Sequence, residues 1–442
     1  MRKNKKTLAL LLVMLLTLPS LARARSFSEY RLTAVSNEEL TTGLSLWQYD
    51  LQGKADDTLF QRLHVVEYRP GINPALVPLV VSRENRVPVR EPVGESMLRL
   101  HQQGQVTPLV GLNGDFFDIA AGGGLGLSIR GGKLYMSGEF SGSWSLGFNA
   151  QGKALLGQPV LRMALSAKRQ GTMLLQAQPI DALNCLRADV PRGGSQPRNA
   201  FDARQDNRLV LYTADWEPFT NTQPGGVEVL VELPDALKPT GVLQGTVQAV
   251  QRTQPDSTTP AGEPRGMALT AGTAVLSATG EAAPLLEKLQ SGDSVIIETG
   301  ISPEWADIVT CLGGGRPDSG PLLVKDGQLQ PEHPEVDDYG YFYPTRHPRT
   351  AVGIRRDGTC FFVVAGGYQK KSAEGLTVAE LSRLMLDLGA VTALNLDGGP
   401  SSTLVVAREG ELEQLNSSRA KGQTPVGNSL VFCLLPSGQV GQ

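Results

Sequence analysis

Short apolar segments separated by glycine-rich turns run through most of this 442-residue chain, which contains 50 glycines. Between residues 119 and 158, turns such as Gly122–Gly124 and Gly131–Gly132 interrupt short apolar stretches. Glycine reaches positive φ angles at no steric cost, so it marks tight turns. Turns this frequent leave room for short strands and favour an antiparallel or mixed β architecture.

The apolar periodicity predicts strands at 45–50, 64–68, 76–81, 106–112, 209–213, 227–231, 241–252, 274–276, 351–354, 360–365, 391–396, 404–407 and 429–434. Helices are expected at 95–102, 282–289 and from Thr377 to Gly389. In the last of these, Thr377 and Glu380 have the spacing of a capping box. We therefore predict an α+β fold, a strand-rich mixed sheet with a few packed helices.

Residues 1–24 are typical of a signal peptide, with a basic start, an apolar stretch from Leu8 to Leu18 and small residues at Ala22 and Ala24. We expect an exported protein, periplasmic or extracellular. No later segment reaches the ~18 unbroken apolar residues of a membrane span. Without residues 1–24 the chain has 36 basic and 44 acidic residues, a net charge of −8 that argues against a nucleic-acid partner.

The middle of the chain has a different composition. Residues 190–207 and 251–266 are rich in Pro, Gly, Arg, Gln and Ser, as exposed loops are. We predict an inserted, mostly β subdomain at 160–300 between two parts of one domain, 25–159 and 301–442. The four cysteines, Cys185, Cys311, Cys360 and Cys433, have no CxxC spacing. They suit either two disulfides or buried thiols.

The segment NLDGGPSST at 395–403 is the strongest candidate site. A strand delivers Asp397 to its end, and Gly398 and Gly399 let the backbone approach a ligand closely. Hydroxyls follow at Ser401, Ser402 and Thr403. A simple β-turn needs fewer polar groups, so we expect this segment to bind a sugar, a phosphate or a metal.

Two further segments carry candidate groups. NGDFFD at 113–118 offers Asn113 and Asp115, either as functional groups or as an Asx-turn over core phenylalanines. Arg346, His347 and Arg349 flank a proline and suit an anion, because guanidinium binds phosphate oxygens in a bidentate manner. A solvated loop is the alternative for this second segment.

Together these segments resemble the motifs of the phosphodiester glycosidase family. The counterparts, in the family's order, are NGDFFD at 113–118, RHPRTAVGI at 346–354 and NLDGGPSSTLV at 395–405. The resemblance is strong over 310–434, clear over 60–150 and faint over 160–300. Two positions depart from the family pattern: Asp115 stands where glycine is common, and Pro400 replaces a third glycine.

The resemblance implies hydrolysis of the bond between a sugar C1 and a phosphodiester oxygen. It implies Asp397 or Asp115 as the catalytic carboxylate and Arg349 with His347 as a positive clamp. Asn113, the 398–403 loop and Arg346 would bind a sugar-phosphodiester or glycan substrate. The sequence demands no cofactor, although Ca²⁺ or Mg²⁺ would suit oxygen ligands.

Two other functions stay open. One is a glycan-binding envelope protein without turnover. The other is a metal-dependent phosphodiesterase that cuts the P–O bond with Asp115, Asp118 and Asp397 as ligands. The sequence does not identify the metal, the sugar or the oligomeric state.

Overall fold

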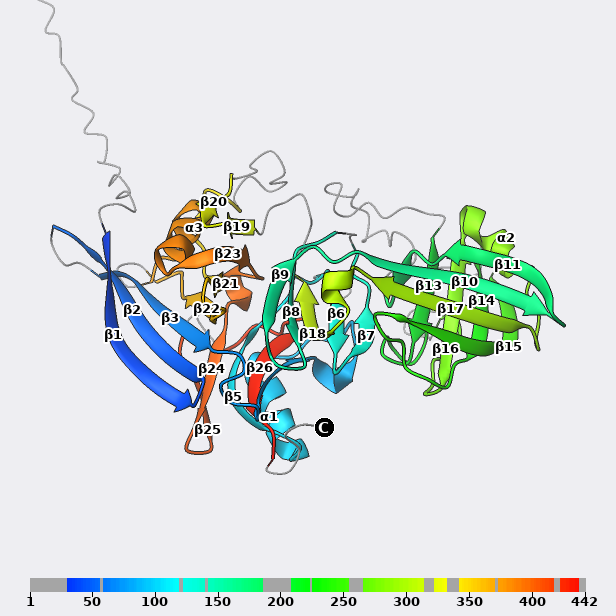
Figure 1. Ribbon diagram of the computed structural model, residues 1–442, viewed down its shortest axis with the longest axis horizontal. Helices are drawn as coiled ribbons and strands as arrows, with labels where there is room; N and C mark the ends of the chain where they lie inside the picture. Colours follow the sequence, from blue (N-terminus) through cyan, green and yellow to red (C-terminus); the bar gives the residue numbers. More distant parts are fainter. Residues whose placement is uncertain are drawn as a thin grey trace, which may run out of the picture.

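The computed structural model describes residues 30–55, 59–118, 122–139, 142–185, 208–222, 225–253, 265–313, 322–331, 342–369, 373–416 and 422–436. The signal segment at 1–24 lies outside these residues. Within them the chain forms 26 strands but only three α-helices (Figure 1). The helices are α1 (Val93–Gln103), α2 (Ala283–Leu286) and α3 (Val378–Asp387). The protein is therefore mostly β, and the α+β prediction gives the helices too much weight.

Sheet I holds the strands that flank the C-terminal part of the candidate site. Its order is β1 (Tyr30–Thr41), β2 (Leu44–Gly53), β3 (Leu59–Tyr68), β22 (Cys360–Ala365), β21 (Arg349–Arg355), β23 (Ala390–Asn395), β19 (Leu322–Lys325) and β20 (Gln328–Leu329). All of its pairings are antiparallel. Strands from residues 30–68 therefore pair directly with strands from residues 349–365.

Sheet II packs face to face with sheet I. Its order is β25 (Glu411–Gln414), β24 (Leu404–Arg408), β5 (Thr107–Asn113), β26 (Ser429–Leu434) and β4 (Leu76–Val81). The apolar cluster between the sheets includes Val66, Val352 and Phe362 from sheet I and Leu112 and Phe432 from sheet II. The outer faces are closed by one helix each. Helix α3 packs on sheet I and α1 on sheet II, so the layers run helix, sheet, sheet, helix.

Sheet III lies in the middle of Figure 1, and sheet IV extends the molecule to the right. Sheet III has the order β7 (Lys133–Met136), β6 (Ser128–Arg130), β18 (Ile308–Gly313), β8 (Ser145–Asn149) and β9 (Ala154–Gly157). Sheet IV has the order β11 (Thr172–Pro179), β10 (Leu161–Arg169), β17 (Ser294–Ile301), β15 (Gly241–Thr253), β14 (Gly226–Glu232), β16 (Thr273–Thr279), β13 (Leu209–Thr213) and β12 (Ala182–Leu183). Its one parallel pair is β12 with β13.

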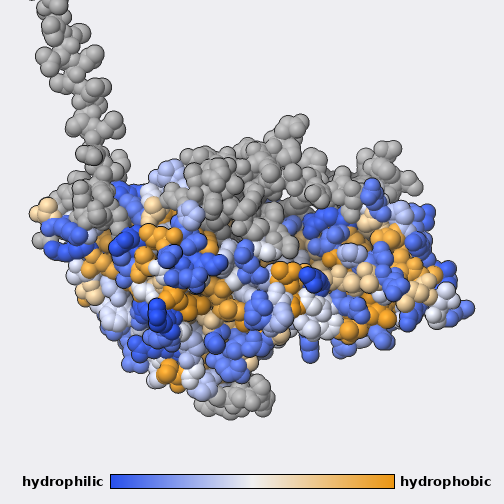
Figure 2. All heavy atoms as spheres, turned by 45° about the horizontal axis from the view of Figure 1, so that its top comes forward, coloured by the Kyte–Doolittle hydropathy of each residue, from blue (hydrophilic) through white to orange (hydrophobic). Residues whose placement is uncertain are grey.

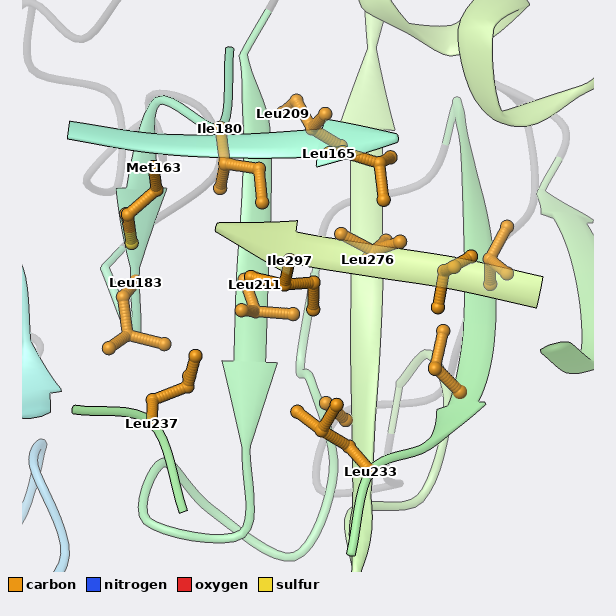
Figure 3. Close-up of a cluster of buried hydrophobic side chains, with 14 of the residues drawn as sticks. Met163, Leu165, Ile180, Leu183, Leu209, Leu211, Leu233, Leu237, Leu276 and Ile297 are labelled. Atoms are coloured by element: carbon orange, nitrogen blue, oxygen red, sulfur yellow. The ribbon is translucent and has the colours of Figure 1, made fainter. Parts of the chain in front are cut away.

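Sheet IV takes all of its strands from residues 161–301, while the sequence predicts an insertion at 160–300. Its core gathers leucine and isoleucine side chains from several strands, among them Leu165, Leu211 and Ile297 (Figure 3). The same apolar cluster continues into sheet III through Ile129 and Ile308. Sheet IV is thus packed against the remainder of the chain by shared apolar burial.

Local sequence signals fix several elements accurately. Strands β4, β13, β22 and β26 have the predicted bounds. The Thr377 hydroxyl accepts from the Glu380 amide (3.1 Å), and a Glu380 carboxylate oxygen accepts from the Thr377 amide (2.9 Å), which is the predicted capping box. Gly389 follows the helix with φ +91°, a conformation that favours glycine.

The surface carries scattered apolar residues within a largely polar covering (Figure 2). Val242 and Ile72 are the most exposed large ones, at 62% and 58%. None of the described helices is long and apolar enough to cross a membrane. All four cysteines are buried free thiols in this structure, which agrees with the thiol interpretation and not with the two disulfides.

The capping box generates a stability prediction. Thr377→Ala removes the side-chain acceptor at the start of α3, and losing such a cap costs ~1 kcal/mol. We expect a lower melting temperature in calorimetry. Thr246→Ala, at an exposed position of β15, is the matched control and should change stability by less than ~0.5 kcal/mol. Equal melting temperatures for Thr377→Ala and the control would contradict the predicted role of the cap.

Candidate active site

Antiparallel pairing brings five strand ends to one place. In sheet I, β23 ends where β21 begins, and in sheet II, β5 ends where β24 and β26 begin. Backbone bonds join the two sets: Asp397 donates to the Gly114 carbonyl (3.2 Å), and Gly399 donates to the Pro348 carbonyl (2.8 Å). The segments around residues 113–115, 347–350, 395–403 and 428 therefore meet at the shared edge of sheets I and II.

Asn113 holds these segments together. Its side chain is fully buried. The Nδ2 atom donates to the Asp397 carbonyl (2.6 Å), while Oδ1 accepts from the Thr350 hydroxyl (2.8 Å) and the Thr403 amide (3.1 Å). All of these partners belong to other strand ends. The position of Asn113 thus gives it a structural task in the site, whatever it contributes to a ligand.

Asp115 lies next to Asn113 and is only 1% exposed. One carboxylate oxygen, Oδ2, accepts from the Gly126 amide (2.7 Å), and the Asp115 amide donates to Oδ1 of Asn428 (2.9 Å). A Cβ at position 126 would lie 2.3 Å from the Gly313 Cα, so only glycine lets this amide approach. Burial, reinforced by the negative charge of Asp397, raises the pKa of Asp115 well above its usual value.

Asp397 is less buried than Asp115 and also accepts hydrogen bonds. Oδ1 accepts from the Gly398 amide (2.8 Å), and the Ser401 hydroxyl is a second donor to the carboxylate. Burial raises the pKa of Asp397 to about 7, and these two hydrogen bonds limit the rise. Gly399 has φ +60° and opens a short 3₁₀ turn, Gly399–Ser401, that brings Ser401 back toward the acid.

Unpaired polar atoms concentrate at this junction. Within the described part of the chain, five buried side-chain oxygens here lack a hydrogen-bond partner: Asp115 Oδ1, Asp397 Oδ2, Ser402 Oγ, Thr403 Oγ1 and Asn395 Oδ1. A buried polar atom without a partner costs about 1–3 kcal/mol. Their concentration at one point indicates a place for a polar ligand or water rather than a closed turn.

Arg349 and His347 lie beside this junction. Arg349 is 1% exposed, and its Nε and Nη2 atoms donate to the carbonyls of Leu376, Phe342 and Thr345. The Nε and Nη2 groups are thus bonded to backbone carbonyls. Arg349 contributes to the site chiefly through its positive charge. Burial, and then the charge of Arg349, lower the pKa of His347 below its usual value. His347 is therefore neutral at pH 7.

Two sequence candidates lie outside this group of residues. Arg346 binds Glu380 in a bidentate manner and also pairs with Glu374 (3.2 Å), so its guanidinium serves helix α3. Asp118 belongs to a turn in which Gly122 donates to its carbonyl. Nowhere in the described residues do three His, Cys, Asp or Glu side chains converge as metal ligands. The set of Asp115, Asp118 and Asp397 required for the phosphodiesterase alternative is not formed.

Two residues of the site were not predicted from the sequence. Asn428 is buried and fixes the Asp115 amide from the start of β26. Tyr368 lies 3.3 Å from Nδ1 of His347 through its hydroxyl. Asn428 stands directly before an apolar strand, just as Asn113 stands at the end of one. This position is a signal that could have identified Asn428 from the sequence. Nothing in the local sequence around Tyr368 marks it.

Fold and site together define a mostly β protein with a pair of buried carboxylates at the shared edge of sheets I and II. Residues 238–433 match the model of the phosphodiester glycosidase family. The match begins inside sheet IV and includes the 346–354 and 395–405 segments, while NGDFFD lies outside it. A stretch of 61 residues is 39% identical to the SPbeta prophage-derived uncharacterized protein YomE of Bacillus subtilis. It covers 14% of this chain and only 9% of that relative.

Two solved structures share the fold. A hypothetical protein from Synechocystis has a TM-score of 0.65 at 18% identity, covering 92% of this chain and 68% of its own. A "Putative exported protein" from Burkholderia pseudomallei has a TM-score of 0.64 at 18% identity, covering 92% of this chain and 97% of its own. The catalytic domain of zebrafish N-acetylglucosamine-1-phosphodiester α-N-acetylglucosaminidase, auto-inhibited by its pro-peptide, has a TM-score of only 0.40 at 16% identity. It covers 92% of this chain and 88% of its own.

The raised pKa of Asp397 predicts a pH dependence of stability. The unfolded chain releases this proton near pH 3.8, whereas the folded protein keeps it until about pH 7. Because the folded state binds more protons in this window, stability falls as the pH rises from about 4 to about 7. Asp397→Asn removes that loss.

The difference in melting temperature between Asp397→Asn and the unmodified protein should therefore shift in favour of the variant as the pH rises from about 4 to about 7. Asp357→Asn is the control, because the pKa of Asp357 lies below its usual value and its carboxylate stays ionised across the window. Parallel melting curves for the unmodified protein and Asp397→Asn would show that Asp397 titrates normally.

Proposed function

We propose that this protein is a glycoside hydrolase that cleaves the C1–O bond between a sugar and a phosphodiester. The products are a free sugar and a phosphate monoester. The observation that carries this proposal is the pair of buried carboxylates, Asp115 and Asp397, each of which has one oxygen without a partner among the described residues. The match of residues 238–433 to the phosphodiester glycosidase family supports the reaction class.

The environments of the two carboxyl groups differ. The pKa of Asp397 is raised to about 7, whereas that of Asp115, more deeply buried and repelled by Asp397, is raised well above its usual value. Environments that separate two carboxyl groups in this way assign them different roles. We assign Asp397 the ionised role, facing the positive charge that develops at C1, and Asp115 the role of a protonated hydrogen-bond donor.

The bond that breaks joins C1 to the phosphate oxygen, and its electron pair leaves with the phosphate. Water adds to C1, directly or after attack by Asp397, and supplies the hydroxyl of the free sugar. The remaining proton goes to solvent or to the phosphate, whose second pKa is ~6. Because this leaving group is weakly basic, hydrogen-bond donors and positive charge matter more than a strong general acid.

Groups on one side of the carboxylates suit the phosphate. The charge of Arg349 and the imidazole of His347 lie beside Gly398 and Gly399, which contact Pro348. The buried hydroxyls of Ser402 and Thr403 lie on the loop that follows Asp397 and suit sugar or phosphate oxygens. Arg346 has no part in this proposal, since Glu374 and Glu380 hold it.

The place of action rests on residues 1–24, which resemble a signal peptide. We propose that the protein is exported and acts in the periplasm or outside the cell on an envelope or extracellular glycan. A glycosyl-1-phosphodiester of N-acetylglucosamine is the first substrate to test, because the family resemblance points to this sugar.

Asp397→Asn and Asp115→Asn should differ in activity. Replacing the ionised Asp397 removes negative charge from the transition state and should lower kcat by roughly 10²–10⁴-fold. Asn at position 115 still donates a hydrogen bond, so Asp115→Asn should retain more activity than Asp115→Ala. Steady-state kinetics on the phosphodiester measures both, with Asp357→Asn as an unaffected surface control. Equal activity in Asp397→Asn and that control would remove Asp397 from the mechanism.

Hydrolysis in ¹⁸O-labelled water separates the candidate functions. Cleavage of the C1–O bond places the label in the sugar, whereas cleavage of the P–O bond places it in the phosphate. Mass spectrometry of the two products reads the difference. Label in the phosphate would replace the proposed reaction with phosphodiester hydrolysis. Saturable binding of a panel of sugar-1-phosphodiesters without any product would favour the glycan-binding alternative.

A further inference from the structure

Tyr368 lies at the outer side of the site with its ring in solvent. The residue is 53% exposed, while its hydroxyl lies 3.3 Å from Nδ1 of His347. The two rings meet edge to face with centroids 6.1 Å apart. A Cβ at Gly399 would lie 3.6 Å from the same hydroxyl. The Tyr368 hydroxyl therefore sits between His347 and the loop that carries Asp397.

The backbone of Tyr368 is strained. Its φ of +62° is left-handed, a conformation that bulky side chains seldom adopt. Such strain persists where the surroundings determine the conformation and where function uses it. Tyrosine occupies a position that suits glycine, and the residue is more than half exposed. This combination indicates a role for the side chain beyond packing.

Hydrogen bonds hold the chain on both sides of Tyr368. The buried amide of Gln61 in β3 donates from Nε2 to the Gly366 carbonyl (3.1 Å) and accepts at Oε1 from the Gly375 amide (2.9 Å). Backbone bonds between His347 and Leu376 run in both directions (3.2 and 2.9 Å). Tyr368 and His347 are thus held against each other by hydrogen bonds that do not involve the side chain of either residue.

The chemistry of the pair fixes the direction of their hydrogen bond. A neutral imidazole has one N–H and one acceptor nitrogen, and which nitrogen carries the proton follows from the partner of the other. A phenol is a better donor than acceptor, so Tyr368 favours an unprotonated Nδ1. The proton then lies on Nε2, which is buried.

We propose that Tyr368 is a positioning residue: its hydroxyl donates to Nδ1 of His347 and holds the imidazole in the tautomer with its proton on Nε2. His347 then presents a neutral N–H donor on the buried side of its ring, next to the charge of Arg349. The use of that donor, to bind a phosphate oxygen of the substrate, rests on the proposed function. The tautomer does not, and it is tested separately.

The first test is spectroscopic. The chain has four histidines, so ¹⁵N-histidine labelling gives a simple spectrum, and His347→Asn identifies the His347 signals. At neutral pH we expect an unprotonated Nδ1 and a protonated Nε2 in the unmodified protein. Tyr368→Phe should move both nitrogens toward the average of exchanging tautomers and leave the other three histidines unchanged. A protonated Nδ1 in the unmodified protein would overturn the proposal, whether or not any variant folds.

The second test separates positioning from packing. Tyr368→Gly removes the side chain and relieves the left-handed backbone, so its melting temperature should equal or exceed that of the unmodified protein while the His347 tautomer is lost. A fall in melting temperature with an unchanged tautomer would give Tyr368 a purely structural role.

Kinetics then tests the use of the donor. Tyr368→Phe should lower kcat on the phosphodiester several-fold with little change in KM. Tyr49→Phe, which removes the same hydroxyl from a tyrosine stacked on Trp47, should change neither. If the protein turns over no phosphodiester, the proposed function fails while the tautomer result stands. If it does so and Tyr368→Phe has normal kcat, Tyr368 has no positioning role in catalysis.

Discussion

The side chain of Asn113 is the contact on which the site depends. It stands at the end of β5 in sheet II and reaches across to Asp397 and Thr350, which belong to the sheet I side. The apolar burial between sheets I and II is strong but has no direction. An amide with one donor group and one acceptor atom, both used, sets how the two edges align. The positions of Asp115 and Asp397 follow from that alignment.

The main strands and helix α3 could be predicted because their signals are local. Alternating apolar residues, the Thr377 and Glu380 cap and the terminal Gly389 each act within a few residues. The strands β1 and β11 were not anticipated, since their burial patterns are mostly exposed and lack a regular alternation. The predicted class was too helical because glycine-rich turns leave few segments long enough for a helix.

The candidate site likewise contains residues that could be predicted from the sequence and residues that could not. Family resemblance pointed to Asp115, Asp397, His347 and Arg349, and the structure describes where these groups lie without testing their roles. The partners of Arg346 could not be predicted from its neighbours in the sequence. Its guanidinium pairs with Glu374 and Glu380, which lie near the start of helix α3. Asn428 and Tyr368 acquire their meaning only from contacts across the fold, with Asp115 and His347 respectively.

The bond between the Asp115 amide and Asn428 joins residues 313 positions apart, so the candidate carboxylate Asp115 is fixed from the residue just before β26, the last of the described strands. Contacts between distant residues form late and slowly during folding. A chain that lacks β26 therefore lacks the partner of the Asp115 amide, and this part of the site is complete only when β26 joins sheet II. Under the proposed function and export, that order would leave the protein inactive until the whole polypeptide has been made and moved.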